Sequence, residues 1–180
     1  MQTFDTPRLH LRPLSEADEA LYCQLYTDPE LMRHIAAPMS IEAAQRSFRA
    51  ACRQQAPQPQ RWIISERATH HAIGLLGLIR GEPGPEIGVM LLAHGHGRGY
   101  GGESMAGMAD RVFAAGTEQI ICARQSVVDN PTVIRMMLRL GFKPLPPTDA
   151  KPSGGEWELT RAQWLARRVA AEVATIDANR

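Results

Sequence analysis

The chain has 180 residues, a length that fits one domain with a sizeable core, and 44% of its residues are hydrophobic, as in ordinary globular proteins. Its formal net charge of +1 offers no strong field to attract nucleic acid or an acidic membrane surface. Its apolar runs fall short of the roughly 18 residues needed to cross a bilayer, and its first residues lack the basic and apolar segments of an export signal.

The first elements predicted are a strand and a helix. Residues 8–14 alternate apolar and polar side chains, as an edge strand does. Ser15 then caps a helix, with Asp18 completing a capping box. Asp28–Pro29 ends that helix, because the residue before a proline is disfavoured in the helical conformation.

A second helix is predicted from Ser40 to about residue 54. Its apolar residues recur at helical spacing and form one stripe: Ile41, Ala44, Phe48 and Ala51. The polar segment 54–60 that follows contains two prolines, and this composition predicts a surface loop.

The middle of the chain predicts three strands, at residues 61–66, 72–80 and 86–93. The connectors between them, RATHH and GEPGP, are too short to hold a crossover helix. The three strands therefore form an antiparallel meander.

The last third predicts a helix after residue 100, a strand at 119–124 and a helix that Asn130–Pro131 opens and Gly141 ends. Two more strands and a C-terminal helix follow, at residues 142–145, 156–160 and 160–180, with a frayed end over 166–180. Neither a repeat nor a clear linker interrupts the chain, so we expect a single domain over residues 1–180.

The three cysteines, Cys23, Cys52 and Cys122, are odd in number and widely spaced. This spacing is unlike a disulfide framework or a zinc site. We expect reduced thiols in a cytoplasmic protein that holds no metal ion.

The most informative segment is a glycine-dense loop between the strand at 86–93 and the helix after it. Five glycines leave the loop almost free of side chains: Gly95, Gly97, Gly99, Gly101 and Gly102. Main-chain N–H groups can then close on a ligand, and the helix adds the positive end of its dipole at the same place. The segment predicts an anion site, and a pyrophosphate is the anion that fits it.

Two other interpretations of this loop are weaker. Residues 97–102 match GxGxxG, the dinucleotide fingerprint, but a meander precedes them where a Rossmann fold needs parallel strands joined by helices. The strand at 119–124 also lacks the carboxylate that binds a ribose. A simple packing turn remains an alternative, although it needs fewer glycines.

These residues resemble the GNAT superfamily of N-acetyltransferases. The acyl-coenzyme A motif of that superfamily, Arg/Gln-x-x-Gly-x-Gly/Ala, falls on residues 94–99, with His94 in the leading position. Further blocks resemble its RimJ/RimL-like branch in order: TPRLHLRPLSEAD, DPELMRHI, EIGVMLLAHGHGRGYGGES, the segment 130–142 and WELTRAQW. The resemblance implies an α/β (α+β) fold with a mixed central sheet of about 6–7 strands, an antiparallel meander, splayed fourth and fifth strands, and flanking helices.

The resemblance also implies acetyl-coenzyme A (acetyl-CoA) as co-substrate and a primary amine as acceptor. Residues 95–101, which include His96, Arg98 and Tyr100, would hold the pyrophosphate. Met90, Leu91 and Leu92 would pair with the pantetheine arm, which Asn130 would also contact. A peptide N-terminus is the acceptor that the branch implies, a small amine is close behind, and a homodimer is left open.

Direct transfer to an amine needs a base and a group that stabilises the oxyanion. Glu86 is the candidate base, with a solvated carboxylate as its alternative, and the N–H of Val89 or Met90 would hold the oxyanion. The serine and tyrosine that other GNAT branches use as proton donors are replaced by Val133 and Met137. Thr132, Tyr100 or water would substitute, or the chain binds acyl-CoA without catalysis.

Overall fold

The computed structural model describes residues 2–53, 59–125, 130–148 and 155–178, with side chains up to residue 171 in the last helix. One mixed sheet of eight strands forms its centre, in the order β1-β2-β3-β4-β5-β6-β8-β7. The strands are β1 Phe4–Asp5, β2 Leu9–Pro13, β3 Gln60–Glu66, β4 Ala72–Ile79, β5 Glu86–Leu91, β6 Ile120–Arg124, β7 Lys143–Pro144 and β8 Glu156–Thr160.

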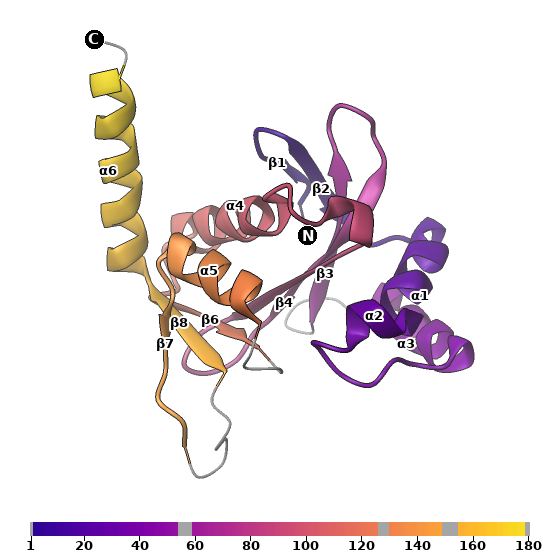
Figure 1. Cartoon of the computed structure of the whole chain (residues 1–180). Coiled ribbons are helices and arrows are strands. Elements are labelled where there is room, and N and C mark those ends of the chain that lie inside the picture. Colours follow the sequence, from indigo (N-terminus) through magenta and orange to yellow (C-terminus); the bar gives the residue numbers. More distant parts are fainter. Residues whose placement is uncertain (1, 54–58, 126–129, 149–154, 179–180) are drawn as a thin grey trace.

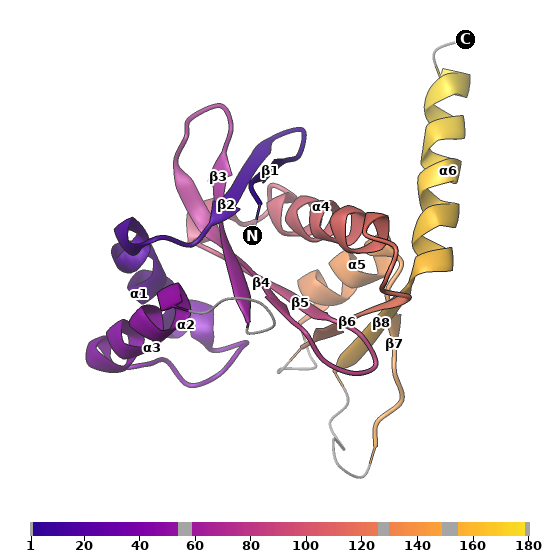
Figure 2. The ribbon, with the colours of Figure 1, turned by 180° about the vertical axis from the view of Figure 1, so that it is seen from behind.

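Helices cover both faces of this sheet. The helical elements are η1 Glu16–Asp18, α1 Glu19–Thr27, α2 Pro29–Met32, α3 Ile41–Arg53, η2 Ala93–Gly95, α4 Tyr100–Ala114, α5 Pro131–Leu140 and α6 Arg161–Ala178. The first three α-helices gather at one side of the sheet, and α4 and α5 lie at the other (Figure 1). The view from behind shows the same division, with α6 projecting away from the other elements (Figure 2).

The core is divided between the two faces in the same way. Side chains of α4 and α5 pack with Ile87 and Leu76 in one cluster, whereas α1 and α3 pack with Ile63 and Leu75 in another. Successive side chains of a strand point to opposite faces. Odd-numbered residues of β5 therefore face α4 and α5, and its even-numbered residues face the side of α1–α3.

The predicted meander is confirmed, because β3, β4 and β5 pair antiparallel in chain order. The predicted helix ends are confirmed as well. Ser15 and Asp18 form a capping box, Asn130 caps α5 with Pro131 at its first position, and Gly141 closes that helix with φ +90°. These local signals fix where the helices that flank the sheet begin and end.

Three expectations differ from the structure. The sheet has eight strands where about 6–7 were expected, because the two-residue strand β1 pairs with β2 and takes the edge position that was assigned to residues 8–14. After Asp28–Pro29 the chain turns at once into α2, which that sequence signal did not predict. Ile41 is 49% exposed and lies outside the buried stripe of α3, because it is the first residue of the helix.

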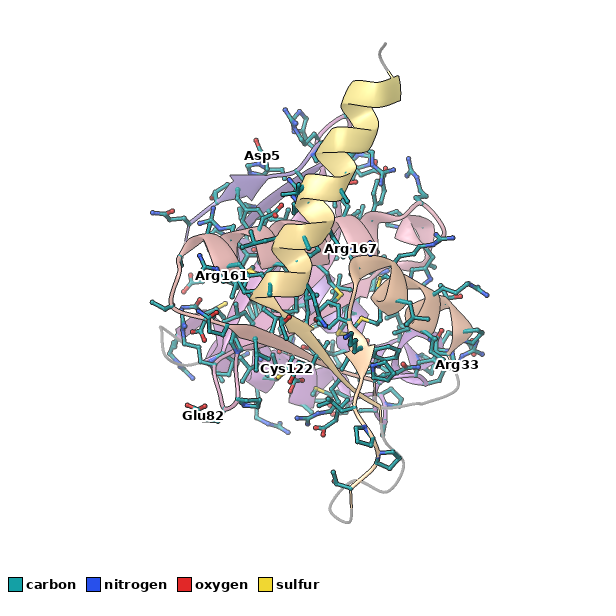
Figure 3. All side chains as sticks on the ribbon, turned by 90° about the vertical axis from the view of Figure 1, so that its left-hand side faces the viewer. Asp5, Arg33, Glu82, Cys122, Arg161 and Arg167 are labelled. Atoms are coloured by element: carbon teal, nitrogen blue, oxygen red, sulfur yellow. The ribbon has the colours of Figure 1, made fainter. Side chains whose placement is uncertain are left out.

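The loop predicted over 54–60 falls mostly on residues outside the described part, as does the centre of the segment before β8. Helix α6 continues to Ala178, and Arg167 on it donates to the main-chain oxygen of Arg139 at the end of α5 (Figure 3). No helix among the described residues is both long enough and apolar enough to cross a membrane.

Asp18 joins β2 to the start of α1. Its carboxylate accepts from Arg12 through both oxygens, at 2.8 and 2.6 Å, and from the N–H of Ser15 at 2.8 Å. Burial alone would raise the pKa of Asp18, but the hydrogen bonds from Arg12 and Ser15 outweigh it, so the pKa lies below its usual value. Ionised Asp18 thus stabilises the folded state at pH values above the pKa that Asp18 has in the unfolded chain, about 3.9. This stabilisation is lost as the pH falls below that value towards the lower pKa of the folded state.

Asp18→Asn is expected to lower the free energy of unfolding by about 1–2 kcal/mol at neutral pH, since it removes a charge-assisted pair from a buried position. Urea titrations of the wild type and the variant between about pH 7 and pH 3 would measure this difference. The difference should shrink towards the acid end. A difference that is constant over this range would show that the ionised carboxylate is not its cause.

Candidate functional site

The sheet opens between β5 and β6. The two strands run parallel and pair only where Glu86 lies opposite Cys122, with the Cys122 N–H donating to the Pro85 oxygen at 2.9 Å. Beyond this point β6 continues to pair with β8, but it no longer pairs with β5. This gap, here called the β5–β6 opening, corresponds to the splayed strands that were expected.

The register of β5 decides which main-chain groups face the opening. The Leu92 N–H donates to Ile73 on the β4 side at 2.8 Å, so the N–H groups of Met90 and Leu92 point towards β4. Those of Val89 and Leu91 point into the opening. The Leu91 oxygen already has a partner, because it lies 2.8 Å from Nε2 of His96.

The glycine loop follows β5 directly and ends at α4. Two of its amides are used within the loop: the Gly95 N–H donates to Leu92 at 2.8 Å and the His96 N–H to Ala93 at 3.1 Å. Gly97 and Gly99 have φ values of +72° and +78°, a conformation in which glycine avoids the strain of a side chain. Gly99 is the N-cap of α4.

The first turn of α4 supplies amides without helical partners. The first helical hydrogen bond of α4 runs from the Glu103 N–H to the Gly99 oxygen at 3.1 Å. The N–H groups of residues 100–102 therefore precede the hydrogen-bonded part of the helix, and they sit at the positive end of its dipole. These amides overlap the segment 95–101 where the sequence predicts an anion site and extend one residue beyond it; the anion site itself stays a prediction.

Glycines also bring this turn close to the β5–β6 opening. A Cβ atom on Gly101 would lie 3.4 Å from Sδ of Met136 on α5 and 3.6 Å from Val89. Val133 packs on the same core, and Met137 is buried. The wall between α4, α5 and β5 is apolar, so neither Val133 nor Met137 offers a proton donor there.

Tyr100 lies on the other side of the loop. Its hydroxyl interacts with the carboxylate of Glu66, and its ring lies under the guanidinium groups of Arg8 and Arg98, each 4.8 Å from the ring centre. Burial, followed by the hydrogen bond to Glu66, raises the pKa of Tyr100. The hydroxyl faces the end of β3, and Arg98 is paired with Glu66, whereas the sequence analysis expected Arg98 to help hold the pyrophosphate.

Asn130 has the local role that its position predicts. Its Oδ1 accepts from the Val133 N–H at 3.2 Å and so caps α5. Thr132, the next residue but one, is exposed at the first turn of the same helix. A contact between Asn130 and a cofactor stays a prediction.

Glu86 lies at the closed end of the opening. Its carboxylate accepts from Arg124 at 2.9 Å, and its side chain is 31% exposed. Gly88, two residues on and on the same face, is exposed, and a Cβ atom there would meet nothing within 4 Å. The face of β5 that points towards α1–α3 is therefore accessible beside Glu86.

More carboxylates share this face, which the sequence analysis missed. Cys122, labelled in Figure 3, lies between Glu86 on β5 and Glu158 on β8, and Glu156 pairs with Arg124 in the same register. Burial raises the pKa of the Cys122 thiol, and the charges of Glu158, Glu86 and Glu156 raise it further. These residues come together only through the register of the strands. The alternation of charged and apolar residues along β8 was the one signal in the sequence that its glutamates share a face of the sheet.

Within the residues that the structure describes, no three His, Cys, Asp or Glu side chains are grouped so that they could hold a metal ion. In this described part, the site consists of main-chain amides, a strand edge without a paired neighbour, an apolar wall and a face bearing carboxylates.

Comparisons with known proteins agree with this geometry. The model of the acetyltransferase (GNAT) domain family matches residues 8–143. An acetyltransferase from Agrobacterium tumefaciens superposes with a TM-score of 0.74 at 24% identity, over 88% of this chain and 94% of that one. No curated protein matches the chain significantly in sequence.

Two similar structures carry ligands. Spermidine N-acetyltransferase from Vibrio cholerae, in complex with CoA and spermine, has a TM-score of 0.71 at 16% identity, over 87% of this chain and 98% of that one. An aminoglycoside acetyltransferase in complex with coenzyme A has a TM-score of 0.71 at 18% identity, over 89% and 99%. At these identities the likeness concerns the fold. The family match over most of the chain, from β2 to β7, shows that the protein belongs to the acetyltransferase (GNAT) domain family.

Proposed function

We propose that this protein transfers an acetyl group from acetyl-CoA to a primary amine. The observation that carries the proposal is the position of the first turn of α4, whose amides precede the helical hydrogen bonds and lie beside an edge of β5 that no other described strand covers beyond Glu86. Acetyl-CoA joins a diphosphate to an arm with two amide groups. The diphosphate suits a helix N-terminus, and the amide-bearing arm suits an open strand edge.

In this arrangement the amides of residues 99–102 would hold the diphosphate. The pantetheine arm would lie along Val89 and Leu91, the residues of β5 whose main-chain groups face the opening, while Met90 and Leu92 would contribute side chains and shape. For the Leu91 oxygen to accept from the arm, the ring of His96, which lies 2.8 Å from it, would have to turn away. Asn130 would contact the arm from the start of α5.

The reaction would join the amine nitrogen to the acetyl carbon and break the bond between that carbon and sulfur. Glu86 would take a proton from the ammonium form of the acceptor, and the Val89 N–H would stabilise the oxyanion. The register favours Val89 over Met90, whose N–H points to β4. The coenzyme A thiolate leaves without a protein acid, because a thiol pKa of about 8.5 makes it a fair leaving group, and it takes up the second proton that the acetylated nitrogen loses.

We further infer that the acceptor is a small, positively charged amine. Glu86, Glu156 and Glu158 lie on the face of the sheet that is accessible beside Gly88, with Arg124 as the cation among them. This excess of carboxylates favours an ammonium-bearing acceptor over a neutral or acidic one. A peptide N-terminus, the acceptor implied by a RimJ/RimL-like branch, is the competing acceptor.

A screen for thiol release tests the proposal. The protein is incubated with acetyl-CoA and, in turn, amino acids, dipeptides, polyamines and aminoglycosides, and free thiol is measured with a chromogenic disulfide. We expect release that depends on one of the cationic amines, with the acetylated amine identified by mass. Preference for dipeptides would contradict the cationic acceptor, and no release with any amine would contradict the enzymatic function.

A second function is favoured by one observation, the apolar residues Val133 and Met137 at the positions of the usual proton donors. The chain would then bind acyl-CoA without turnover, as a sensor or structural subunit. Thermal stabilisation by acetyl-CoA without thiol release from any amine would indicate this function.

A further inference from the structure

A cluster of charged side chains lies behind the glycine loop, on the side away from the β5–β6 opening. Its centre is Glu66, the last residue of β3, which is only 8% exposed. The carboxylate accepts from Arg98 of the loop and from Oγ1 of Thr69 at 2.8 Å, and it interacts with the hydroxyl of Tyr100. The hydrogen bonds from Thr69 and Tyr100 and the charge of Arg98 lower the pKa of Glu66, so it is ionised at neutral pH.

A second carboxylate completes the cluster from α4. Glu103 accepts from Nε of Arg8 at 2.6 Å, from the Arg8 main-chain N–H at 2.8 Å and from Thr6 at 2.6 Å. Arg8 in turn donates to the main-chain oxygen of Arg98 at 2.9 Å. The guanidinium groups of Arg8 and Arg98 lie over the same Tyr100 ring. The start of β2, the end of β3, the loop and the first turn of α4 are thus tied together.

We propose that Glu66 is a positioning residue for the cofactor loop. Arg98, which donates to Glu66, and Tyr100, whose hydroxyl interacts with the same carboxylate, are the two neighbours of Gly99, the N-cap of α4. By holding both neighbours, Glu66 fixes the direction of the amides at residues 99–102. This inference rests on the proposed function, since it takes those amides to be the diphosphate site.

The alternative is that Arg98 itself binds the diphosphate. The two roles predict opposite effects of neutralising Glu66. If Arg98 binds the diphosphate directly, loss of the Glu66 charge would free its guanidinium, and the diphosphate would bind more tightly. If Glu66 instead holds the glycine loop in position, neutralising Glu66 would loosen the loop, and the diphosphate would bind less tightly.

The experiment compares coenzyme A binding to the wild type and to Glu66→Gln by calorimetry, together with KM and kcat for acetyl-CoA. We expect Glu66→Gln to weaken coenzyme A binding and to raise KM by about ten-fold, the equivalent of one charge-assisted hydrogen bond. The value of kcat should change less than about two-fold, because Glu66 lies away from the opening. Pantetheine, which lacks the diphosphate, should bind the wild type and the variant equally.

Two further variants keep the result decisive. Asp18→Asn removes a comparable buried ion pair at the opposite end of β2, so it controls for lost stability and should leave coenzyme A affinity unchanged. Tyr100→Phe keeps the ring under both guanidiniums but removes the hydroxyl, and we expect a smaller loss of affinity than with Glu66→Gln.

Equal or tighter binding of coenzyme A by Glu66→Gln would overturn the positioning role, and so would an equal loss of pantetheine affinity. Were Glu66→Gln not to fold, an unchanged affinity in Tyr100→Phe would overturn it as well. A wild type that binds no coenzyme A would instead refute the proposed function, so the two failures are distinguishable.

Discussion

Replacing Gly99 with valine is expected to weaken acetyl-CoA binding by about a hundred-fold or more, the largest single effect on affinity that the structure predicts. Gly99 has φ +78°, where a β-branched residue is strongly strained. Its new Cβ atom would also lie 3.4 Å from Nη2 of Arg8. The backbone must therefore shift at the N-cap of α4, which turns the amides of residues 100–102 away from the diphosphate.

Gly116→Val is the matched control for this change. Gly116 has φ +81° just beyond the other end of α4, and a Cβ atom there meets nothing within 4 Å. Both variants carry the same kind of backbone strain, but only Gly99 belongs to the proposed anion site. Calorimetric titration with acetyl-CoA should show a large loss for Gly99→Val alone. Equal dissociation constants of the two variants for acetyl-CoA would show that the glycine loop is not part of the binding site.

Replacing Glu86 with glutamine is expected to lower kcat by about 10²–10³ at neutral pH, within the range usual for loss of a general base. The amide cannot accept the proton that the ammonium group must lose before it attacks the thioester. Affinity for acetyl-CoA should stay within about two-fold of wild type, because Glu86 lies at the closed end of the opening, away from the amides of α4. Rates measured across pH should rise with pH in the variant, as free amine becomes abundant.

The variant Arg124→Gln distinguishes the effect of losing the Glu86–Arg124 ion pair from the effect of losing the Glu86 carboxylate. It breaks the same 2.9 Å contact but leaves the carboxylate in place. We expect Arg124→Gln to retain most of the wild-type kcat, whereas Glu86→Gln does not. Equal losses of kcat in both variants would mean that the ion pair acts as a structural element. A wild-type kcat in Glu86→Gln would exclude Glu86 as the base.

Local chemistry made much of the fold predictable. The connectors before β4 and β5, residues 67–71 and 80–85, leave no room for a crossover helix, so antiparallel pairing followed from length alone. Asn130 and Pro131 at the start of α5, and Gly141 at its end, act through their own backbone preferences, which do not depend on distant residues. The glycine loop was recognisable for the same reason.

Contacts between distant residues were not predictable. Glu66 and Arg98 are 32 positions apart, and Arg8 and Glu103 are 95 apart, so no local pattern links them. The use of the Gly95 and His96 amides within the loop depends on the exact turn that the chain makes after β5, which composition does not specify. The carboxylates of β5 and β8 came together only through the register of three neighbouring strands.

The most direct test of the account is a crystal structure of the protein with coenzyme A. We predict that diphosphate oxygens lie within hydrogen-bond distance of main-chain N–H groups of residues 99–102, with the pantetheine arm beside Val89 and Leu91 in the β5–β6 opening. A diphosphate bound elsewhere, or an arm that leaves the edge of β5 uncovered, would contradict it.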